Sequence, residues 1–141
     1  PAPGGAGGAS CMRLALADGG VEPEQIGYIN AHGTSTHLND SCETAAIKSV
    51  FGSHAYELAV SSTKSMTGHE MWMAGASEVV YSMLMMRHGF IAPNINFTEG
   101  DEATSKLNIP VRRVDTEFDC FLSNSFGFGG TNSTLIVKKY K

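Results

Sequence analysis

The sequence predicts an α/β fold, in which helices and strands alternate along one domain. Two observations predict it. Apolar segments of strand type, at residues 26–30 and 58–61, are each followed by a segment with the apolar spacing of a helix. Near the end of the chain, a glycine-rich turn at residues 126–131 joins the apolar segments 119–125 and 132–138, which adds an antiparallel hairpin. The 141 residues are enough for one domain with its own core.

The first elements are a short amphipathic helix and a strand. Apolar residues at helical spacing predict a helix over Ser10–Asp18, which a pair of glycines ends. The strand Ile26–Asn30 follows and leads directly into a loop of small and hydroxyl residues that contains His32. A second helix is expected to begin with Asp40 as its N-terminal cap and to end at Gly52.

The middle of the chain repeats this arrangement. A second buried strand is expected at residues 58–61, and it opens into the polar loop 62–69. A long helix is then predicted from about Glu70 to Arg87. Its apolar residues cover most of its circumference, so we expect it to be buried on several sides, with its methionines as core packing.

Composition excludes several classes of function. The net charge is −4 without a basic block, so no nucleic-acid partner is expected. No apolar run is long enough to span a membrane. Cys11, Cys42 and Cys120 lack CxxC spacing, which argues against a disulfide framework or a zinc site and favours reduced thiols in the cytoplasm. Residues 1–8 resemble neither a translation start nor a secretory signal, so we expect this chain to be part of a longer one.

Three chemically active side chains lie in polar loops that follow the two strands: His32, Lys64 and His69. Each of them alone could be structural. A fold that aligns the strand ends would bring two imidazoles and an ammonium group together, and this set suits the stabilisation of negative charge on a carbonyl oxygen. Lys64 would also keep a neighbouring imidazole neutral by charge repulsion.

Three segments that contain these side chains resemble a known family. Asn30–Thr36 (NAHGTST), Ser61–His69 (SSTKSMTGH) and Ser123–Asn132 (SNSFGFGGTN) are similar, in order and spacing, to the three C-terminal signatures of β-ketoacyl-acyl-carrier-protein synthases. The elongating synthases I and II of bacterial type II fatty-acid synthesis are the most similar, and synthase I more so. The resemblance implies a thiolase-like layered α/β fold with a mixed sheet, and it makes residues 1–141 the C-terminal half of such an enzyme.

The resemblance also implies a reaction, a decarboxylating Claisen condensation of an acyl thioester with malonyl-acyl-carrier protein. In this reading His32 and His69 donate hydrogen bonds to the malonyl thioester oxygen and stabilise the enolate that decarboxylation creates. Lys64 orients the two imidazoles and sets their charge state. Glu43 corresponds to the acidic residue that pairs with this lysine.

Further roles come from the same resemblance. Thr34 and Thr36 match the hydroxyls that bind the phosphopantetheine arm of the carrier protein, Phe126 matches a gating aromatic, and the backbone N–H of Phe128 matches an oxyanion-hole donor. No resident cofactor is required beyond that arm, which the substrate carries. The residues that correspond to a monovalent-cation site of some members are Asn30, Glu43, Glu78 and Ser123.

This chain departs from the family pattern at two positions. His37 stands where the family usually has proline, and we interpret it as an exposed loop variant. Trp72 stands in a segment that is usually rich in small residues, and its added volume leads to the hypothesis that it reshapes either the acyl channel or the subunit interface.

The nucleophilic cysteine of the family lies in the N-terminal half, at the start of a helix, and none of the three cysteines here has that setting. This chain alone is therefore expected not to condense substrates. The expected partners are an acyl carrier protein, the N-terminal half of the same enzyme and a second copy in a homodimer. The alternatives are a cysteine-less subunit similar to a chain-length factor, a polyketide-type ketosynthase domain, and a non-enzymatic module that binds a pantetheine arm. Intact His32, Lys64 and His69 argue against the chain-length factor.

Overall fold

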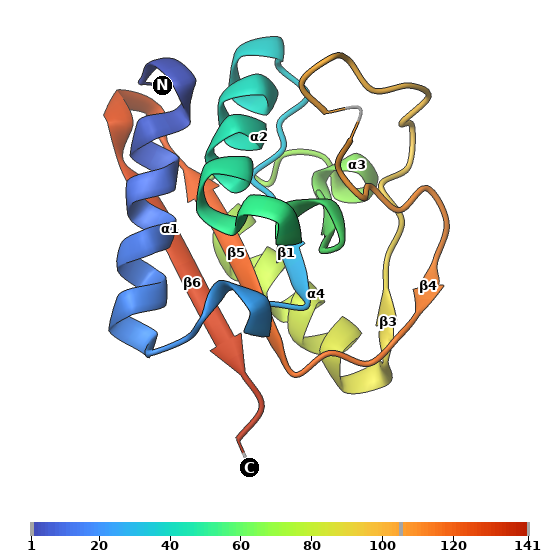
Figure 1. The fold of residues 1–141 in the computed structure, drawn as a ribbon. Helices are drawn as coiled ribbons and strands as arrows, with labels where there is room; N and C mark the ends of the chain where they lie inside the picture. Colours follow the sequence, from blue (N-terminus) through green and yellow to red (C-terminus); the bar gives the residue numbers. More distant parts are fainter. Residues whose placement is uncertain (1, 105, 141) are drawn as a thin grey trace.

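Parallel and antiparallel strands are combined in the main sheet, as the sequence predicts. In the computed structural model, which describes residues 2–104 and 106–140, this sheet has the order β2-β1-β5-β6 (Figure 1). The strands are β1 (Tyr28–Asn30), β2 (Ala59–Ser61), β3 (Phe90–Ile91), β4 (Val114–Asp115), β5 (Cys120–Phe126) and β6 (Asn132–Lys138). The helices are α1 (Ala6–Gly19), α2 (His37–Phe51), α3 (Lys64–Thr67) and α4 (Ala74–His88). Short 3₁₀ turns are η1 (Pro3–Gly5), η2 (Pro23–Gln25), η3 (Gly52–Tyr56), η4 (Met71–Met73) and η5 (Phe128–Gly130).

The parallel strand β1 lies at the centre of the sheet and pairs with both β2 and β5. The predicted C-terminal hairpin is confirmed: β5 and β6 pair antiparallel over their whole length, from Cys120 opposite Lys138 to Phe126 opposite Asn132. The turn between them needs glycine, because Gly129 and Gly130 have φ angles of 83° and 85°, which side-chain-bearing residues rarely adopt. Because β5 runs parallel to β1, the hairpin tip stands at the same end of the sheet as the loop after β1.

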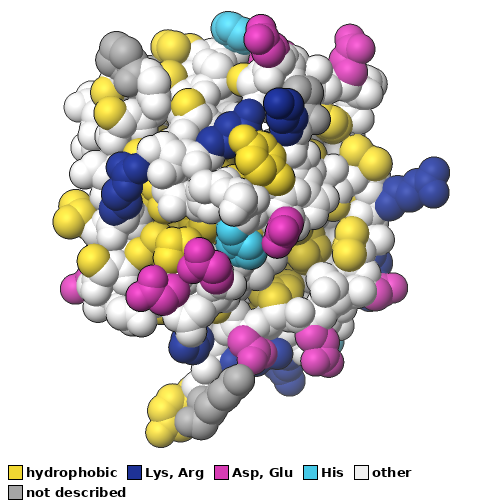
Figure 2. All heavy atoms as spheres, viewed as in Figure 1, with side chains coloured by type: hydrophobic (Ala, Val, Ile, Leu, Met, Phe, Trp, Pro, Cys, Tyr) yellow, Lys and Arg dark blue, Asp and Glu magenta, His cyan; other side chains and the backbone are white. Residues whose placement is uncertain are grey.

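Helices cover both faces of the sheet, and the alternation of side chains along each strand builds two cores. Ile29 and Leu122 face α1 and α2, and their neighbours Tyr28 and Phe121 face the other side, where α4 lies (Figure 1). All four side chains have no exposed surface. On the face drawn in Figure 2, acidic and basic side chains are interspersed among uncharged ones. Within the described residues, no helix is both long and apolar enough to serve as a membrane span.

The start of α2 differs from the expectation. The helix begins at His37, and its N-terminal cap is Thr36, whose Oγ1 accepts a hydrogen bond from the backbone N–H of Asn39 at 3.4 Å. The prediction that Asp40 caps this helix is therefore wrong, because an earlier hydroxyl residue has the extended backbone that a cap requires. The predicted end at Gly52 is confirmed, since the N–H of this residue bonds the carbonyl of Lys48.

The expectation of a helix from Glu70 to Arg87 that is buried on several sides is also wrong. The regular helix α4 starts at Ala74, after the 3₁₀ turn η4. Met85 and Met86 pack in the core, whereas many of the other large apolar side chains of this segment are exposed. Trp72 is 100% exposed. Apolar spacing around a helix therefore did not predict burial here, because within this chain the sheet covers one side of α4. The large exposed apolar side chains of η4 and α4 are Met71, Trp72, Met73, Val80, Met83 and Leu84.

Candidate active site

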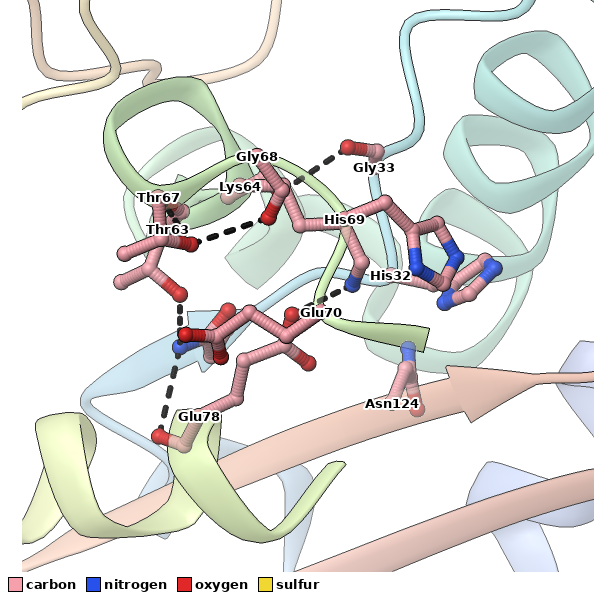
Figure 3. A network of polar contacts seen from close by, with 12 residues as sticks. His32, Gly33, Thr63, Lys64, Thr67, Gly68, His69, Glu70, Glu78 and Asn124 are labelled. Atoms are coloured by element: carbon pink, nitrogen blue, oxygen red, sulfur yellow. Dashed lines mark hydrogen bonds and ion pairs between the residues drawn. The ribbon is translucent and has the colours of Figure 1, made fainter. Parts of the chain in front are cut away.

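Two imidazoles meet at the end of the parallel strands. His32 follows β1 by two residues, and His69 follows the short helix α3 that continues from β2. Since β1 and β2 are parallel, the loops that leave them lie at the same edge of the sheet. The ring centroids of His32 and His69 are 5.8 Å apart and the rings are perpendicular, at 88° (Figure 3). The structure thus brings together the two histidines that the sequence proposed, with Lys64 beside them.

Lys64 is the first residue of α3, and its side chain is only 5% exposed. Its Nζ forms an ion pair with Oε1 of Glu78, which is 1% exposed and lies on α4. The expectation that Glu43 pairs with this lysine is wrong, because α4 places Glu78 directly against α3 while the carboxylate of Glu43 is turned to the backbone of another loop. Burial raises the pKa of Glu78, and the contact with Lys64 opposes that rise.

Glu43 shapes the loop that carries His32. One of its carboxylate oxygens accepts the backbone N–H of His32 at 2.9 Å, and the other accepts that of Gly33, also at 2.9 Å. Asn124 of β5 donates a third hydrogen bond from its Nδ2 at 3.1 Å. Burial raises the pKa of Glu43, and the backbone and side-chain donors oppose that rise. The carboxylate therefore ties the loop that carries His32 to α2 and β5.

His32 is held in its neutral form. Burial, the charge of Lys64 and the neighbouring His69 lower its pKa to about 4, with burial the largest cause. The ring of Phe126 lies 5.6 Å away, centroid to centroid, and contributes an apolar wall. The sequence predicted that Lys64 keeps a neighbouring histidine neutral; the direction is confirmed, although burial contributes more than the lysine. A neutral imidazole retains one N–H and can donate it to an oxygen.

His69 is oriented by the backbone that follows it. The N–H of Met71 donates to Nδ1 of His69 at 3.0 Å, so the ring proton lies on Nε2. The imidazole is exposed, which leaves Nε2–H free to donate to a substrate. Met71 has a φ of 54°, in the left-handed region that non-glycine residues rarely occupy. The sequence reasoning missed Met71, since only its backbone acts and no side-chain pattern marks it.

The remaining predicted residues lie around this centre. Thr34 and Thr36, proposed as pantetheine contacts, are adjacent: their Oγ1 atoms are 3.1 Å apart. Thr36 in addition caps α2, a structural role that the sequence did not reveal. Phe126 lies beside His32, and Phe128 lies in η5 at the hairpin tip with its side chain fully exposed. His37 is exposed and its Nδ1 is 3.9 Å from Asp101, which fits the interpretation of an exposed loop variant.

A set of buried oxygen atoms lies next to the Lys64–Glu78 pair. Asn30 Oδ1, Glu78 Oε2 and Ser123 Oγ are buried and have no hydrogen-bond partner among the described residues. Asn30 and Ser123 are opposite each other in the pairing of β1 with β5, and Asn30 Nδ2 lies 3.5 Å from the backbone oxygen of Glu78. Oxygen donors of this kind suit a hard cation. Glu43, the fourth residue of the expected set, fits less well, because both of its oxygens already accept hydrogen bonds.

The three cysteines lie in settings unlike that of a nucleophile. Cys11 and Cys42 are half-buried in the interiors of α1 and α2, and Cys120 is buried in β5, where desolvation raises the pKa of its thiol. A nucleophilic thiolate needs a lowered pKa. The interpretation that all three are structural agrees with these positions.

The titration of His32 provides a direct measurement. We expect its ring to protonate with a midpoint near pH 4 in an NMR titration of histidine-labelled protein. Because the folded-state pKa lies below the usual value of 6.5, protonation favours the unfolded chain. The contribution of His32 to stability is therefore complete above pH 6.5 and is lost as the pH falls toward 4. A midpoint near pH 6.5 would contradict the neutral, buried imidazole.

Comparisons with known proteins show the family of this chain. The model of the family "Beta-ketoacyl synthase, C-terminal domain" matches residues 1–98. The chain is 50% identical over 140 residues to 3-oxoacyl-acyl-carrier-protein synthase 1 of Escherichia coli K12, covering 99% of this chain and 33% of that protein. It is 49% identical over 139 residues to synthase 2 of Coxiella burnetii, covering 99% of this chain and 34% of that protein. The chain thus spans about a third of the length of the curated relatives it matches.

Solved structures show the same fold. A type II PKS ketosynthase, in complex with its acyl-carrier protein and bound to a hexaketide, superimposes with a TM-score of 0.92 at 36% identity, covering 99% of this chain and 34% of that one. The ishigamide ketosynthase/chain length factor does so with a TM-score of 0.89 at 41% identity, covering 94% of this chain and 32% of that one. The expected thiolase-like α/β fold with a mixed sheet is confirmed. With its two facing imidazoles and buried lysine, this chain belongs to the β-ketoacyl synthase family and matches the C-terminal domain of that family.

Proposed function

We propose that this chain forms the decarboxylating, carbonyl-activating part of a 3-oxoacyl-acyl-carrier-protein synthase active site. The observation that carries the proposal is the perpendicular pair His32 and His69: burial and Lys64 keep His32 neutral, and the Met71 amide on Nδ1 of His69 leaves Nε2–H of that ring as a donor. Two such donors aimed at one oxygen stabilise an enolate, because they are in place before charge develops there. The relatives named as 3-oxoacyl-acyl-carrier-protein synthases, at about 50% identity, support fatty-acid elongation.

In the proposed reaction, the bond between the malonyl carboxylate and the α-carbon breaks, and carbon dioxide leaves. The electron pair of that bond moves into the thioester and places negative charge on its oxygen, which His32 and His69 hold by hydrogen bonds. The α-carbon then attacks an acyl thioester carbonyl, and the thiolate that carried the acyl group departs. We propose that this thiolate belongs to a cysteine in an N-terminal half of the same enzyme, because no cysteine of this chain has a suitable setting.

The substrate reaches this centre on a carrier protein. We propose that an acyl carrier protein delivers it on a phosphopantetheine arm and that Thr34 and Thr36, whose hydroxyls are adjacent, bind the arm. Phe126 is proposed as the gating aromatic beside His32, and the backbone N–H of Phe128 as an oxyanion donor. A solved ketosynthase in complex with its acyl-carrier protein supports this partner, and another in complex with its chain length factor supports a dimeric arrangement. The proposed location is the cytoplasm.

We also propose that a monovalent cation binds beside the Lys64–Glu78 pair. Asn30, Glu78 and Ser123 each contribute a buried oxygen that has no hydrogen-bond partner within the described residues. A cation held by them would neutralise the second oxygen of the Glu78 carboxylate, whose first oxygen contacts Lys64. Glu43 is the remaining residue of the proposed set, and both of its carboxylate oxygens already accept hydrogen bonds from the loop after β1.

The experiment is a decarboxylation assay. The full-length synthase that contains this chain is mixed with malonyl-acyl-carrier protein, and the release of carbon dioxide is measured. We expect release by the unmodified enzyme and loss of release in the double variant His32→Ala/His69→Ala. His88→Ala, at an exposed position on the last turn of α4, is the matched control and should be as active as the unmodified enzyme. Undiminished release by the double variant would refute the proposed function.

A further inference from the structure

Glu70 follows His69 directly in the chain (Figure 3), and two hydrogen bonds hold it in place. Tyr81 of α4 donates its hydroxyl to Oε1 of Glu70 at 3.1 Å. The backbone carbonyl of Glu70 accepts the N–H of Met73 at 3.2 Å. Both Glu70 and Tyr81 are half-buried. The turn after the catalytic imidazole is thus fastened to the body of α4 through a side-chain contact between residues 11 positions apart.

Met71, enclosed by these two contacts, has a backbone conformation that needs support. Its φ of 54° is unfavourable for a residue with a side chain, and such strain persists only where the surroundings impose it. Its own side chain is 62% exposed, so packing of that side chain does not impose it. Around this residue the structure shows the hydrogen bonds of Glu70 to Tyr81 and Met73, and the Met71 carbonyl itself accepts the N–H of Ala74. The strained conformation is what directs the Met71 N–H at Nδ1 of His69.

We propose that Glu70 and Tyr81 are positioning residues for His69: their hydrogen bond holds the turn that keeps the Met71 amide on Nδ1, and so keeps the ring proton on Nε2. This inference rests on the proposed function, in which Nε2–H of His69 is a donor to the substrate oxygen. Neither residue touches the substrate in this scheme. Both residues act by fixing the orientation and the tautomer of the His69 imidazole.

Charge adds a second consequence. The titratable and charged groups around His69 are His32, Lys64 and Glu70, with Glu78 behind Lys64. Glu70 is the acidic group nearest in sequence, and a free carboxylate there would favour a positively charged imidazole. The hydroxyl of Tyr81 donates a hydrogen bond to this carboxylate. The same contact raises the pKa of the Tyr81 phenol, so the hydroxyl keeps its proton. When the Tyr81 hydroxyl is removed, we expect the side chain of Glu70 to turn toward His69.

Two substitutions, both made in the full-length synthase, separate the effect of the Tyr81–Glu70 hydrogen bond from the effect of the Glu70 charge. Tyr81→Phe removes the hydroxyl and leaves Glu70 charged. We expect kcat for malonyl decarboxylation to fall roughly 3- to 10-fold with an unchanged KM, the size of one lost hydrogen bond. The acid limb of the pH–rate profile should move to higher pH. Glu70→Gln keeps an Oε1 acceptor for Tyr81 but removes the charge, so kcat should stay within about twofold and the acid limb should not move upward.

Further measurements make the test decisive. Glu70→Ala, at a half-buried position, should lower kcat as Tyr81→Phe does but without the upward shift of the acid limb. The ¹⁵N shifts of the His69 ring should report less Nε2-protonated tautomer in Tyr81→Phe. Tyr140→Phe, on a fully exposed tyrosine near the C-terminus, is the matched control and should change nothing.

The outcomes separate this inference from the proposed function. If Tyr81→Phe and Glu70→Ala keep kcat, pH profile and tautomer, or lower only the unfolding temperature, the positioning role is refuted. If in the same preparation His69→Ala is inactive, the proposed function still stands. If His69→Ala is fully active, the proposed function itself is refuted.

Discussion

Replacement of His69 by alanine will lower the rate of malonyl decarboxylation by roughly 10²- to 10³-fold, with little change in KM for the malonyl carrier protein. The reason is that Nε2–H of this ring donates to an oxygen that becomes charged only as carbon dioxide leaves. The Met71 amide already holds Nδ1, so the donor is in place before the reaction starts. Carbon dioxide release under saturating substrate measures the effect.

His32→Ala should give a loss of similar size, and the double variant should lose less than the product of the two. Both imidazoles hydrogen-bond one oxygen, and residues that act as a unit are not additive. The exposed His88→Ala provides the control for histidine removal. A rise in KM alone, with kcat unchanged, would mean that the two rings bind the substrate and its enolate equally well and do not favour the enolate.

Replacement of Lys64 by methionine will destabilise the fold by about 3–5 kcal/mol, because it leaves the carboxylate of Glu78 buried without its cation. Glu78 already has a raised pKa from burial, and loss of Lys64 removes the contact that opposes this rise. The variant should therefore be more stable at pH 5 than at pH 7, since the protonated carboxyl is the form that tolerates burial. Urea unfolding at the two pH values measures both effects.

The double variant Lys64→Met/Glu78→Gln should recover most of the lost stability while remaining impaired in decarboxylation. Lys139→Met is the control, because Lys139 also pairs with a carboxylate, Asp119 at 3.3 Å, but on the surface. Exposed pairs of this kind contribute about 1 kcal/mol or less. If Lys64→Met and Lys139→Met cost the same, the buried pair has no special role in stability.

The positions of the two histidines were predictable from the sequence because parallel strands end at one edge of a sheet. His32 and His69 each follow an apolar strand segment, and the distance between their rings confirms that the loops converge. The C-terminal hairpin was predictable too, since its glycines mark the turn and its apolar segments mark the strands. Turn glycines and apolar strand segments predict structure reliably here because they depend on only a few neighbouring residues.

The partner of Lys64 was not predictable in the same way. Sequence reasoning assigned it to Glu43, whereas the ion pair is with Glu78 on α4. Which carboxylate meets the lysine depends on how α4 is rotated and placed against the sheet, and apolar residues all around that helix left its buried side undefined. The N-terminal cap of α2 was predicted wrongly because Thr36 and Asp40 both have side chains that can cap a helix.

By itself, the sequence determined the order of the elements, the family and the three side chains His32, Lys64 and His69, because apolar spacing and motif spacing are properties of the chain as written. Only the tertiary structure decided the hydrogen-bond partners: Glu78 for Lys64, the loop amides for Glu43, and the Met71 amide for His69. These choices depend on distances between segments far apart in the chain and on a strained backbone angle. Neither quantity is set by residue type alone, since both follow from how the packed layers fit together.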